Sequence, residues 1–453
     1  MSVLDRVDTI VLLMLENRSF DHLLGHLSYG PYANGTAVEG LLQDGTLSGD
    51  LPHHRNEVAT QLALSAVSGK YTMRGFAQAY FQMEIQQSRS ATPDTLGFLR
   101  PADVPVTRFL VDNYAVCDHW FAPLPTSTQP NRIMSLAGTT RIDETTGLFP
   151  PLDQLVLQWL EDRHVRWRVY HSGISFFALL GQAAIFGPNF RSIDRLAADV
   201  ANERPGDFPQ VIIIEPSYGD APHLPGEVAN DNHAPLPVAP GEALLERVYD
   251  ALTCNPDRWK KTLWILTYDE HGGFFDHVPP PAVTYRPASN AMFVKPFESL
   301  GVRVPTVVVS PLVSAQRVAS DVFDHTSWLQ LLAEKFAPGT PYSAAVEERR
   351  QQGVGSASQV LDRSTPRTGI PRSPPPPPMP QGAGTLAGPA RRARAAPVPT
   401  DLQRAFEAAA RSMFDTYPRA TSQQYPQVAH WALTTPPPDA PSRPRQRRAR
   451  GRR

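Results

Sequence analysis

Four oxygen-bearing side chains follow two apolar segments of this 453-residue chain and could together bind a cation. Glu16 and Asn17 come directly after one apolar run, and Asp269 and Glu270 come directly after another. Adjacent carboxylates repel each other unless a cation or a proton intervenes, and carboxylate and amide oxygens are typical ligands of hard divalent cations. Capping of the next helix would explain the first pair alone. Two acidic strand ends on one chain favour a metal site.

A turn rich in hydroxyl groups offers a nucleophile. Segment 125–132 contains Thr126, Ser127 and Thr128 and ends in Arg132. A hydroxyl is a weak nucleophile unless a metal or a base lowers its pKa, and a cation held by the four side chains above would do so. Arg132 could neutralise the charge of a phosphate group. Taken alone, such a segment is more often an ordinary turn.

His233 is a candidate general acid. It lies in the polar loop 230–235, not on an apolar face, so its ring could protonate a leaving oxygen. A surface histidine without a catalytic role is an equally good interpretation of this loop alone. Three weaker candidates are His171, Asp324 and His325.

Short apolar runs predict the strands that would position these residues. Runs without polar alternation, typical of parallel strands covered on both faces, are 9–15, 211–214, 262–267 and 304–309. Segment 165–170 alternates, which predicts a half-exposed strand. Helix-like segments between the strands are 152–162, 241–252 and 326–336. The alternation predicts an α/β fold with a mostly parallel central sheet sandwiched by helices, whose carboxyl edge is the expected place for a ligand.

The overall composition excludes few classes of protein. The net charge is −1, although segment 441–453 carries seven arginines and no acid. The two cysteines, Cys117 and Cys254, are expected to be unpaired thiols, because a core this large needs no disulfide. No apolar run approaches the ~20 residues of a membrane span, so no stable membrane insertion is expected. The start lacks signal-peptide features, which predicts a cytoplasmic protein, or a secreted or periplasmic one if the start codon is misassigned.

Composition changes along the chain predict four parts. Residues 1–340 are expected to form the catalytic domain, and 341–399 a disordered linker that includes five consecutive prolines at 374–378. Residues 400–418 predict an amphipathic helix that could dock on the body. Residues 419–453 predict a disordered Pro/Arg-rich tail. This basic tail could contact anionic lipid or nucleic acid, although a solvated, solubilising tail is favoured.

Six motifs, in order, resemble those of the bacterial phosphoesterase family that contains non-haemolytic phospholipases C and a group of acid phosphatases. They are Glu16-Asn17-Arg18-Ser19-Phe20-Asp21, Thr95-Leu96-Gly97-Phe98, Cys117-Asp118, Thr128-Gln129-Pro130-Asn131-Arg132, Asn230-Asp231-Asn232-His233 and the segment from Asp269 to Val278. The resemblance extends from about residue 8 to about residue 338 and implies an alkaline-phosphatase-like fold.

The resemblance also implies residue roles. One divalent metal ion would be bound by Glu16, Asn17, Thr128, Asp269 and Glu270. Thr128 stands at the nucleophile position, and His233 would transfer a proton or bind a phosphate oxygen. The family's phospholipases usually have Gly-Pro where this chain has Thr126 and Ser127. Oxygen ligands favour Ca²⁺, Mg²⁺ or Mn²⁺, with Zn²⁺ possible.

Three functions are compatible with these motifs. The first is a phospholipase C-like phosphodiesterase that acts through a phosphothreonine intermediate on a small-molecule or phospholipid phosphate ester. The alternative is an acid phosphatase that acts on phosphomonoesters. A more remote alternative is a non-catalytic binding protein that has the same fold.

Overall fold

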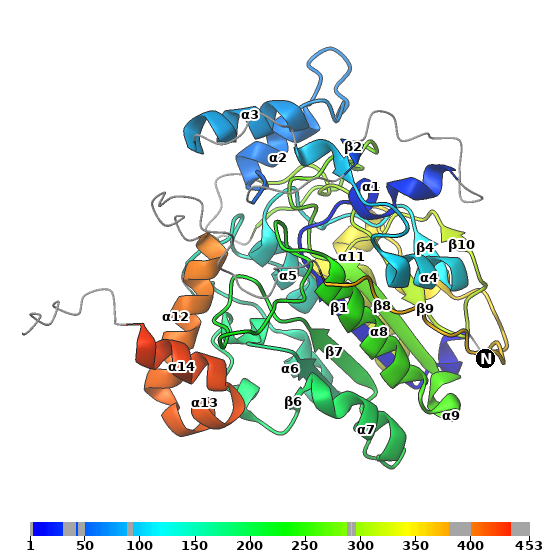
Figure 1. Ribbon diagram of the computed structural model, residues 1–453. Helices are drawn as coiled ribbons and strands as arrows, with labels where there is room; N and C mark the ends of the chain where they lie inside the picture. The colour runs from blue at the N-terminus through cyan, green and yellow to red at the C-terminus, as the bar shows by residue number, and fades with distance from the viewer. Residues whose placement is uncertain are drawn as a thin grey trace, which may run out of the picture.

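A central sheet flanked by helices forms the body of the protein, and three C-terminal helices lie beside it (Figure 1). The computed structural model describes residues 3–29, 42–43, 50–87, 94–147, 149–287, 291, 296–379 and 400–435. Within these ranges the predicted α/β class and the mostly parallel central sheet are confirmed.

The main sheet has eight strands in the order β10-β4-β9-β8-β1-β7-β5-β6. The strands are β1 (Thr9–Leu15), β4 (Ala115–Cys117), β5 (Trp167–His171), β6 (Phe190–Ser192), β7 (Val211–Glu215), β8 (Thr262–Tyr268), β9 (Val307–Val309) and β10 (Arg317–Ala319). A separate parallel pair consists of β2 (Leu42–Gln43) and β3 (Gly97–Phe98). In the main sheet only β9 is antiparallel to its neighbours. The central strand β1 pairs in parallel with both β7 and β8.

Two strand predictions need correction. Run 304–309 forms only the short strand β9, which is antiparallel. Burial on both faces gives the same apolar pattern in either direction, so composition could not show this. Segment 165–170 was predicted to be half-exposed, but every residue of β5 is buried. Arg168 is buried because its guanidinium pairs with Glu203, 3.0 Å away, and with Asp199 of α7.

Helices cover the sheet on both sides. They are α1 (Phe20–Leu24), α2 (Arg55–Leu62), α3 (Phe76–Gln87), α4 (Pro105–Asn113), α5 (Thr128–Ala137), α6 (Val156–Glu161), α7 (Leu196–Asn202), α8 (Ala239–Thr253), α9 (Pro256–Trp259), α10 (Ser327–Phe336) and α11 (Ala344–Gln351). Helices α4, α7 and α9 contact α8, which lies in front of the sheet in Figure 1. Helices α5 and α10 are joined by Trp328, whose indole N–H donates to the carbonyl oxygen of Ser135 at 2.7 Å.

The C-terminal segment is more helical than its composition predicted. The predicted amphipathic helix is α12 (Asp401–Thr416), which buries its apolar face against the body. It is followed by α13 (Pro418–Gln424) and α14 (Pro426–Thr434), where a disordered tail was expected. A proline is tolerated in the first turn of a helix, where its missing N–H has no intrahelical partner. The predicted basic end from 436 onward lies outside the described residues.

The predicted linker is shorter than expected. Helix α11 and a 3-10 turn at Ala357–Val360 lie within the range that was predicted to be disordered. Arg349 of α11 anchors this segment, because its guanidinium pairs with the buried Asp324 carboxylate at 2.5 Å. The apolar side chain of Val346 is also buried. Residues 380–399 of the linker lie outside the described residues.

The two cysteines and the membrane prediction can be compared with the structure directly. Cys117 is buried, Cys254 is exposed, and both are free thiols, as predicted. Among the helices of the described ranges, none combines the length and the apolar character that crossing a bilayer requires.

Replacement of Leu13 by alanine tests how far the fold depends on β1. Leu13 is fully buried between Ile214 of β7 and Leu266 of β8. We expect Leu13→Ala to lower the free energy of unfolding by about 2–5 kcal/mol through lost burial and a residual cavity. Urea denaturation measures the change. Leu433→Ala is the matched control, because Leu433 is 75% exposed, and an equal loss in both variants would contradict this account.

Candidate active site

The ends of β1 and β8 bring the two acidic pairs together. These strands pair in register with Leu15 opposite Tyr268, so Glu16 and Asp269 are neighbours at the carboxyl edge of the sheet. The backbone N–H of Asn17 donates to Asp269 Oδ1 at 3.0 Å. Asn17 has a left-handed backbone (φ 58°), which turns the chain sharply after the strand. The parallel register therefore assembles the cluster that the sequence could only suggest.

Several oxygens in this cluster have no hydrogen-bond partner although they are buried. Within the described residues these are both carboxylate oxygens of Glu16, Asp269 Oδ2 and Glu270 Oε1. Burial raises the pKa of Glu16 to about 7, against the opposing effect of the Arg132 charge. Burial also raises the pKa of Asp269. A buried carboxylate oxygen without a partner is costly, and a divalent cation with oxygen ligands would satisfy this set.

The loop after β8 is shaped to keep Glu270 in place. Its Oε2 accepts from the backbone N–H of Gly272 at 2.8 Å, and His271 Nδ1 lies 3.1 Å from the same oxygen. Gly272 has φ 61°, and a Cβ there would lie 2.3 Å from the carbonyl oxygen of Asn17. The turn therefore requires glycine, which lets the two strand-end loops approach each other closely.

Thr128 lies at the first position of α5 and faces the cluster. Its hydroxyl donates to Asn17 Oδ1 at 3.4 Å. The neighbouring hydroxyl groups are engaged elsewhere. Thr126 donates to the carbonyl oxygen of Asp143 at 2.5 Å, and the oxygen of Ser127 accepts from the backbone N–H of Thr145 at 2.8 Å. Of the three hydroxyls that the sequence offered, the structure directs Thr128 into the site.

Asn131 holds the turn that presents Thr128. Its amide nitrogen donates to the carbonyl oxygens of Leu124, Thr126 and Ser127, at 3.2, 2.9 and 3.0 Å. Its Oδ1 accepts from the backbone N–H of Leu124 at 2.9 Å. The Asn131 side chain thus supplies hydrogen-bond partners for backbone groups that an irregular buried turn would otherwise leave without any.

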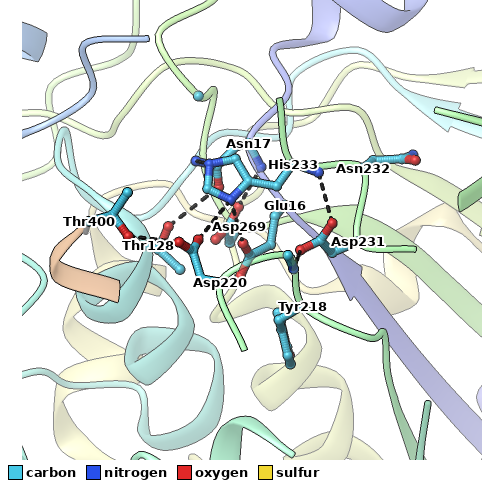
Figure 2. A network of polar contacts seen from close by, with 12 residues as sticks. Glu16, Asn17, Thr128, Tyr218, Asp220, Asp231, Asn232, His233, Asp269 and Thr400 are labelled. Atoms are coloured by element: carbon cyan, nitrogen blue, oxygen red, sulfur yellow. Dashed lines mark hydrogen bonds and ion pairs between the residues drawn. The ribbon is translucent and has the colours of Figure 1, made fainter. Parts of the chain in front are cut away.

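His233 lies beside the carboxylate cluster. Its ring faces Glu16, Asp220 and Asn17 in Figure 2. Its Nδ1 lies 3.3 Å from Glu16 Oε2 and 3.2 Å from Asp220 Oδ2. Its Nε2 lies 3.1 Å from the amide nitrogen of Asn17 and 3.4 Å from Asp50 Oδ1. Two carboxylates at Nδ1 keep a proton on that nitrogen, which leaves Nε2 as the atom that can exchange one.

Arg132 lies beneath the carboxylates. Its Nε is 3.2 Å from Glu16 Oε1 and 3.3 Å from Asp269 Oδ2. Its terminal nitrogens donate to the hydroxyl of Tyr218 at 3.1 Å and to the carbonyl oxygens of Met14 and Leu15 at 3.2 and 3.0 Å. The guanidinium is thus held by protein groups, and it compensates part of the negative charge of Glu16 and Asp269.

A model described as the phosphoesterase family matches residues 7–337. The chain belongs to this family. The resemblance inferred from the six motifs is therefore confirmed, and the predicted site residues all lie within the matched region of this phosphoesterase.

Individual relatives are named phospholipases. Non-specific phospholipase C6 of Arabidopsis thaliana is 34% identical over 345 residues, which cover 70% of this chain and 64% of the relative. The chain thus spans slightly less than two thirds of that protein. Phospholipase C A of Mycobacterium tuberculosis is 28% identical over 421 residues, covering 80% of this chain and 78% of the relative. A solved protein in the alkaline phosphatase superfamily from Vibrio parahaemolyticus is 11% identical, with a TM-score of 0.35. The match covers 73% of this chain and 66% of the chain of that protein.

Sequence reasoning missed several residues that line the phosphoesterase site. Asp220 and Asp50 both contact His233. His53 lies 3.6 Å from Asp50. Burial opposes its protonation, but the charges of Asp50 and Glu270 raise the pKa of His53 to about 9. These residues lie in irregular segments without strand-end patterning, so no sequence signal marked them. The three weaker candidates, His171, Asp324 and His325, contact other protein groups.

The three weaker candidates from the sequence have structural contacts. His325 is buried, receives the indole N–H of Trp120 at Nδ1 (3.2 Å), and donates from Nε2 to the carbonyl oxygen of Asp269 at 2.7 Å. It supports the backbone of the cluster. Asp324 pairs with Arg349, and His171 Nδ1 bonds to the carbonyl oxygen of Gly173 at 2.7 Å.

A buried ion-pair network links the two acidic loops behind the cluster. Arg303 donates to Asp21 Oδ1 at 3.0 Å and to Asp276 Oδ1 at 2.9 Å. His277 Nδ1 lies 2.6 Å from Asp21 Oδ2. Asp21 lies in the first turn of α1, and Asp276 lies in the loop after β8, so one guanidinium fixes their spacing. Arg303 thus compensates negative charge of the Asp21, Asp276 and His277 cluster.

Removal of Arg303 should destabilise the protein strongly. Arg303→Met would leave two buried carboxylates without their cation, and we expect a loss of about 3–5 kcal/mol in the free energy of unfolding. The control is Arg317→Met, whose pair with Asp362 is partly exposed and should be worth less than about 1 kcal/mol. Chemical denaturation of both variants measures the difference, and equal losses would argue against the network.

Addition of a divalent cation should raise the melting temperature of the metal-stripped protein. A cation that binds only the folded state stabilises it by about 2.7 kcal/mol at a hundred times its Kd. Glu16→Gln should abolish this rise without lowering the melting temperature of the stripped protein, because it removes one of several mutually repelling charges. Glu347→Gln changes a carboxylate on the surface helix α11 and should leave the rise intact. A full rise in Glu16→Gln, measured by scanning fluorimetry, would count against a metal at this cluster.

Proposed function

We propose that this phosphoesterase is a metal-dependent phospholipase C-like phosphodiesterase with Thr128 as its nucleophile. The observation that carries the proposal is the position of the Thr128 hydroxyl, which donates to Asn17 Oδ1 beside buried carboxylate oxygens that have no hydrogen-bond partner. The ion-pair contacts of Arg132 and His233 compensate only part of their charge. The names of the relatives from Arabidopsis thaliana and Mycobacterium tuberculosis support phospholipase C chemistry.

The side chains that would hold the metal ion are those of Glu16, Asn17, Thr128, Asp269 and Glu270. A bound divalent cation would lower the pKa of the Thr128 hydroxyl and offset the negative charge of the transition state. Ca²⁺, Mg²⁺ and Mn²⁺ suit this oxygen-rich set, and Zn²⁺ is the alternative. Asn17 orients the hydroxyl, and the N-terminus of α5 favours a negatively charged group next to Thr128.

The reaction proceeds in two displacements. Thr128 Oγ1 forms a bond to phosphorus as the bond from phosphorus to the leaving alcohol breaks, and the hydroxyl proton passes to solvent, which gives a phosphothreonine. His233 Nε2 donates a proton to the leaving oxygen, while its Nδ1 proton stays between Glu16 and Asp220. A water molecule then attacks phosphorus and gives up a proton to His233 Nε2. The bond from phosphorus to Thr128 Oγ1 breaks, the phosphomonoester is released, and the threonine oxygen regains a proton from solvent.

Arg132 has a different role from the one that the sequence suggested. Its guanidinium donates to protein groups, including two backbone carbonyl oxygens and the Tyr218 hydroxyl. It also stacks over the rings of Phe176 and Tyr218. We therefore assign Arg132 to positioning Glu16 and Asp269 rather than to direct binding of phosphate.

Substitution of Thr128 tests the proposal. Thr128→Ala should lower kcat by at least about a thousandfold, the order found when a covalent nucleophile is lost, while the melting temperature stays near that of the wild type. Thr128→Ser keeps a hydroxyl and should retain measurable turnover. The assay compares p-nitrophenylphosphorylcholine with p-nitrophenyl phosphate, using stripped enzyme with each metal added back.

The outcomes of this assay separate the candidate functions. Preference for the choline diester supports the phosphodiesterase, and preference for the monoester supports an acid phosphatase. Turnover by Thr128→Ala at the wild-type rate would exclude Thr128 as the nucleophile. Absence of turnover of either ester with every metal would favour the non-catalytic binding protein.

A further inference from the structure

The three C-terminal helices lie outside the part of the chain that matches the family, yet the first of them, α12, contacts residues around the active site. The family match ends at residue 337, whereas the first of these helices begins at Asp401. Helix α12 lies beside the body in Figure 1, and its cap residue Thr400 appears among the site residues in Figure 2. The contacts occur at two separate points of α12.

The first contact is a hydrogen bond from Thr400 to Asp220. The Thr400 hydroxyl donates to Asp220 Oδ1 at 2.7 Å. The Thr400 hydroxyl oxygen also accepts from the backbone N–H of Gln403 at 2.9 Å and so caps α12. The other carboxylate oxygen of Asp220 lies 3.2 Å from His233 Nδ1. One hydroxyl thus ties the start of α12 to the carboxylate that faces the active-site histidine.

The second contact joins α12 to the support of the carboxylate cluster. The fully buried ring of Phe406 lies 5.1 Å from the ring of Tyr218, centroid to centroid. The Tyr218 hydroxyl accepts from Arg132, which holds Glu16 and Asp269 from below. The histidine side of the site is therefore linked to α12 through Asp220, and the carboxylate side is linked to it through Arg132 and Tyr218.

The helices are held on the body by contacts that do not involve Thr400. Tyr425 is fully buried, stacks on His171 at 5.1 Å, and donates to the carbonyl oxygen of Ile185 at 3.1 Å. Gln424 donates to the carbonyl oxygen of Phe186 at 3.2 Å. Because this anchoring is separate, the hydroxyl of Thr400 can be removed without releasing the helices.

We propose that the C-terminal helices complete the active site, with Thr400 and Asp220 as positioning residues that fix the ring of His233. A carboxylate bonded to one imidazole nitrogen sets the tautomer and orientation of the ring. Asp220 does this at Nδ1, and Thr400 restrains the carboxylate from its far side. The inference rests on the proposed role of His233 in proton transfer, and it assigns a function to a segment beyond the family-matched region.

A double-mutant cycle in the full-length enzyme tests the proposal. Thr400→Val removes the hydroxyl at nearly constant volume, and it should lower kcat on p-nitrophenylphosphorylcholine about tenfold with little change in KM, the size expected for one hydrogen bond to a charged group. Thr400→Ser should recover most of the turnover. In an Asp220→Ala background, Thr400→Val should cause no further loss, because Thr400 acts through Asp220.

Controls separate positioning from stability. Thr434→Val removes an exposed hydroxyl from α14 of the same unit and should leave kcat unchanged. Equal and additive losses for Thr400→Val and Asp220→Ala would overturn the proposed chain of contacts, as would a loss in Thr400→Val that Thr400→Ser does not recover.

A second readout does not depend on activity. In nitrogen-detected NMR of the histidine side chains, Nδ1 of the wild-type His233 ring should give a single protonated signal, and Thr400→Val should broaden or shift that signal. An unchanged His233 signal in Thr400→Val would overturn the positioning role even if kcat falls. A wild-type enzyme that hydrolyses neither ester, but shows the predicted NMR change, would refute the proposed function and leave the contact between Thr400, Asp220 and His233 supported.

Discussion

The repulsion among buried carboxylates at the ends of β1 and β8 is the constraint on which the rest of the site depends. Glu16, Asp269 and Glu270 are fully buried, and several of their oxygens have no hydrogen-bond partner. Carboxylates in this setting raise the energy of the folded state unless positive charge compensates them. Arg132 compensates part of this negative charge, because its guanidinium lies 3.2 Å from Glu16 and 3.3 Å from Asp269.

The surrounding structure keeps this strained cluster at fixed dimensions. Arg303 joins the two acidic loops behind it, and Gly272 lets them approach without a side chain between them. The helix that presents Thr128 is held by Asn131, while His233 is held by Asp220. Each reactive group therefore has a separate support, so that its orientation does not depend on a bound ligand.

The C-terminal helices add a support that lies far away in the sequence. Their apolar faces bury against the body because they contain enough large side chains to offset the entropy of ordering them. The flanking segments are rich in proline and arginine, so the composition predicted a disordered tail instead of these docked helices. Docking brings Thr400 next to Asp220 across 180 positions of sequence.

The sequence by itself determined the α/β class, the central strands and the two acidic pairs, because burial on both faces leaves an uninterrupted apolar run that ends abruptly in polar residues. It did not determine the direction of β9, since buried strands of either direction have the same composition. The tertiary structure alone decided which hydroxyl faces the carboxylate cluster and which acids face His233. These choices depend on the register of β1 against β8 and on loops such as those carrying Asp50 and Asp220, whose conformations are set by contacts between residues far apart in the chain.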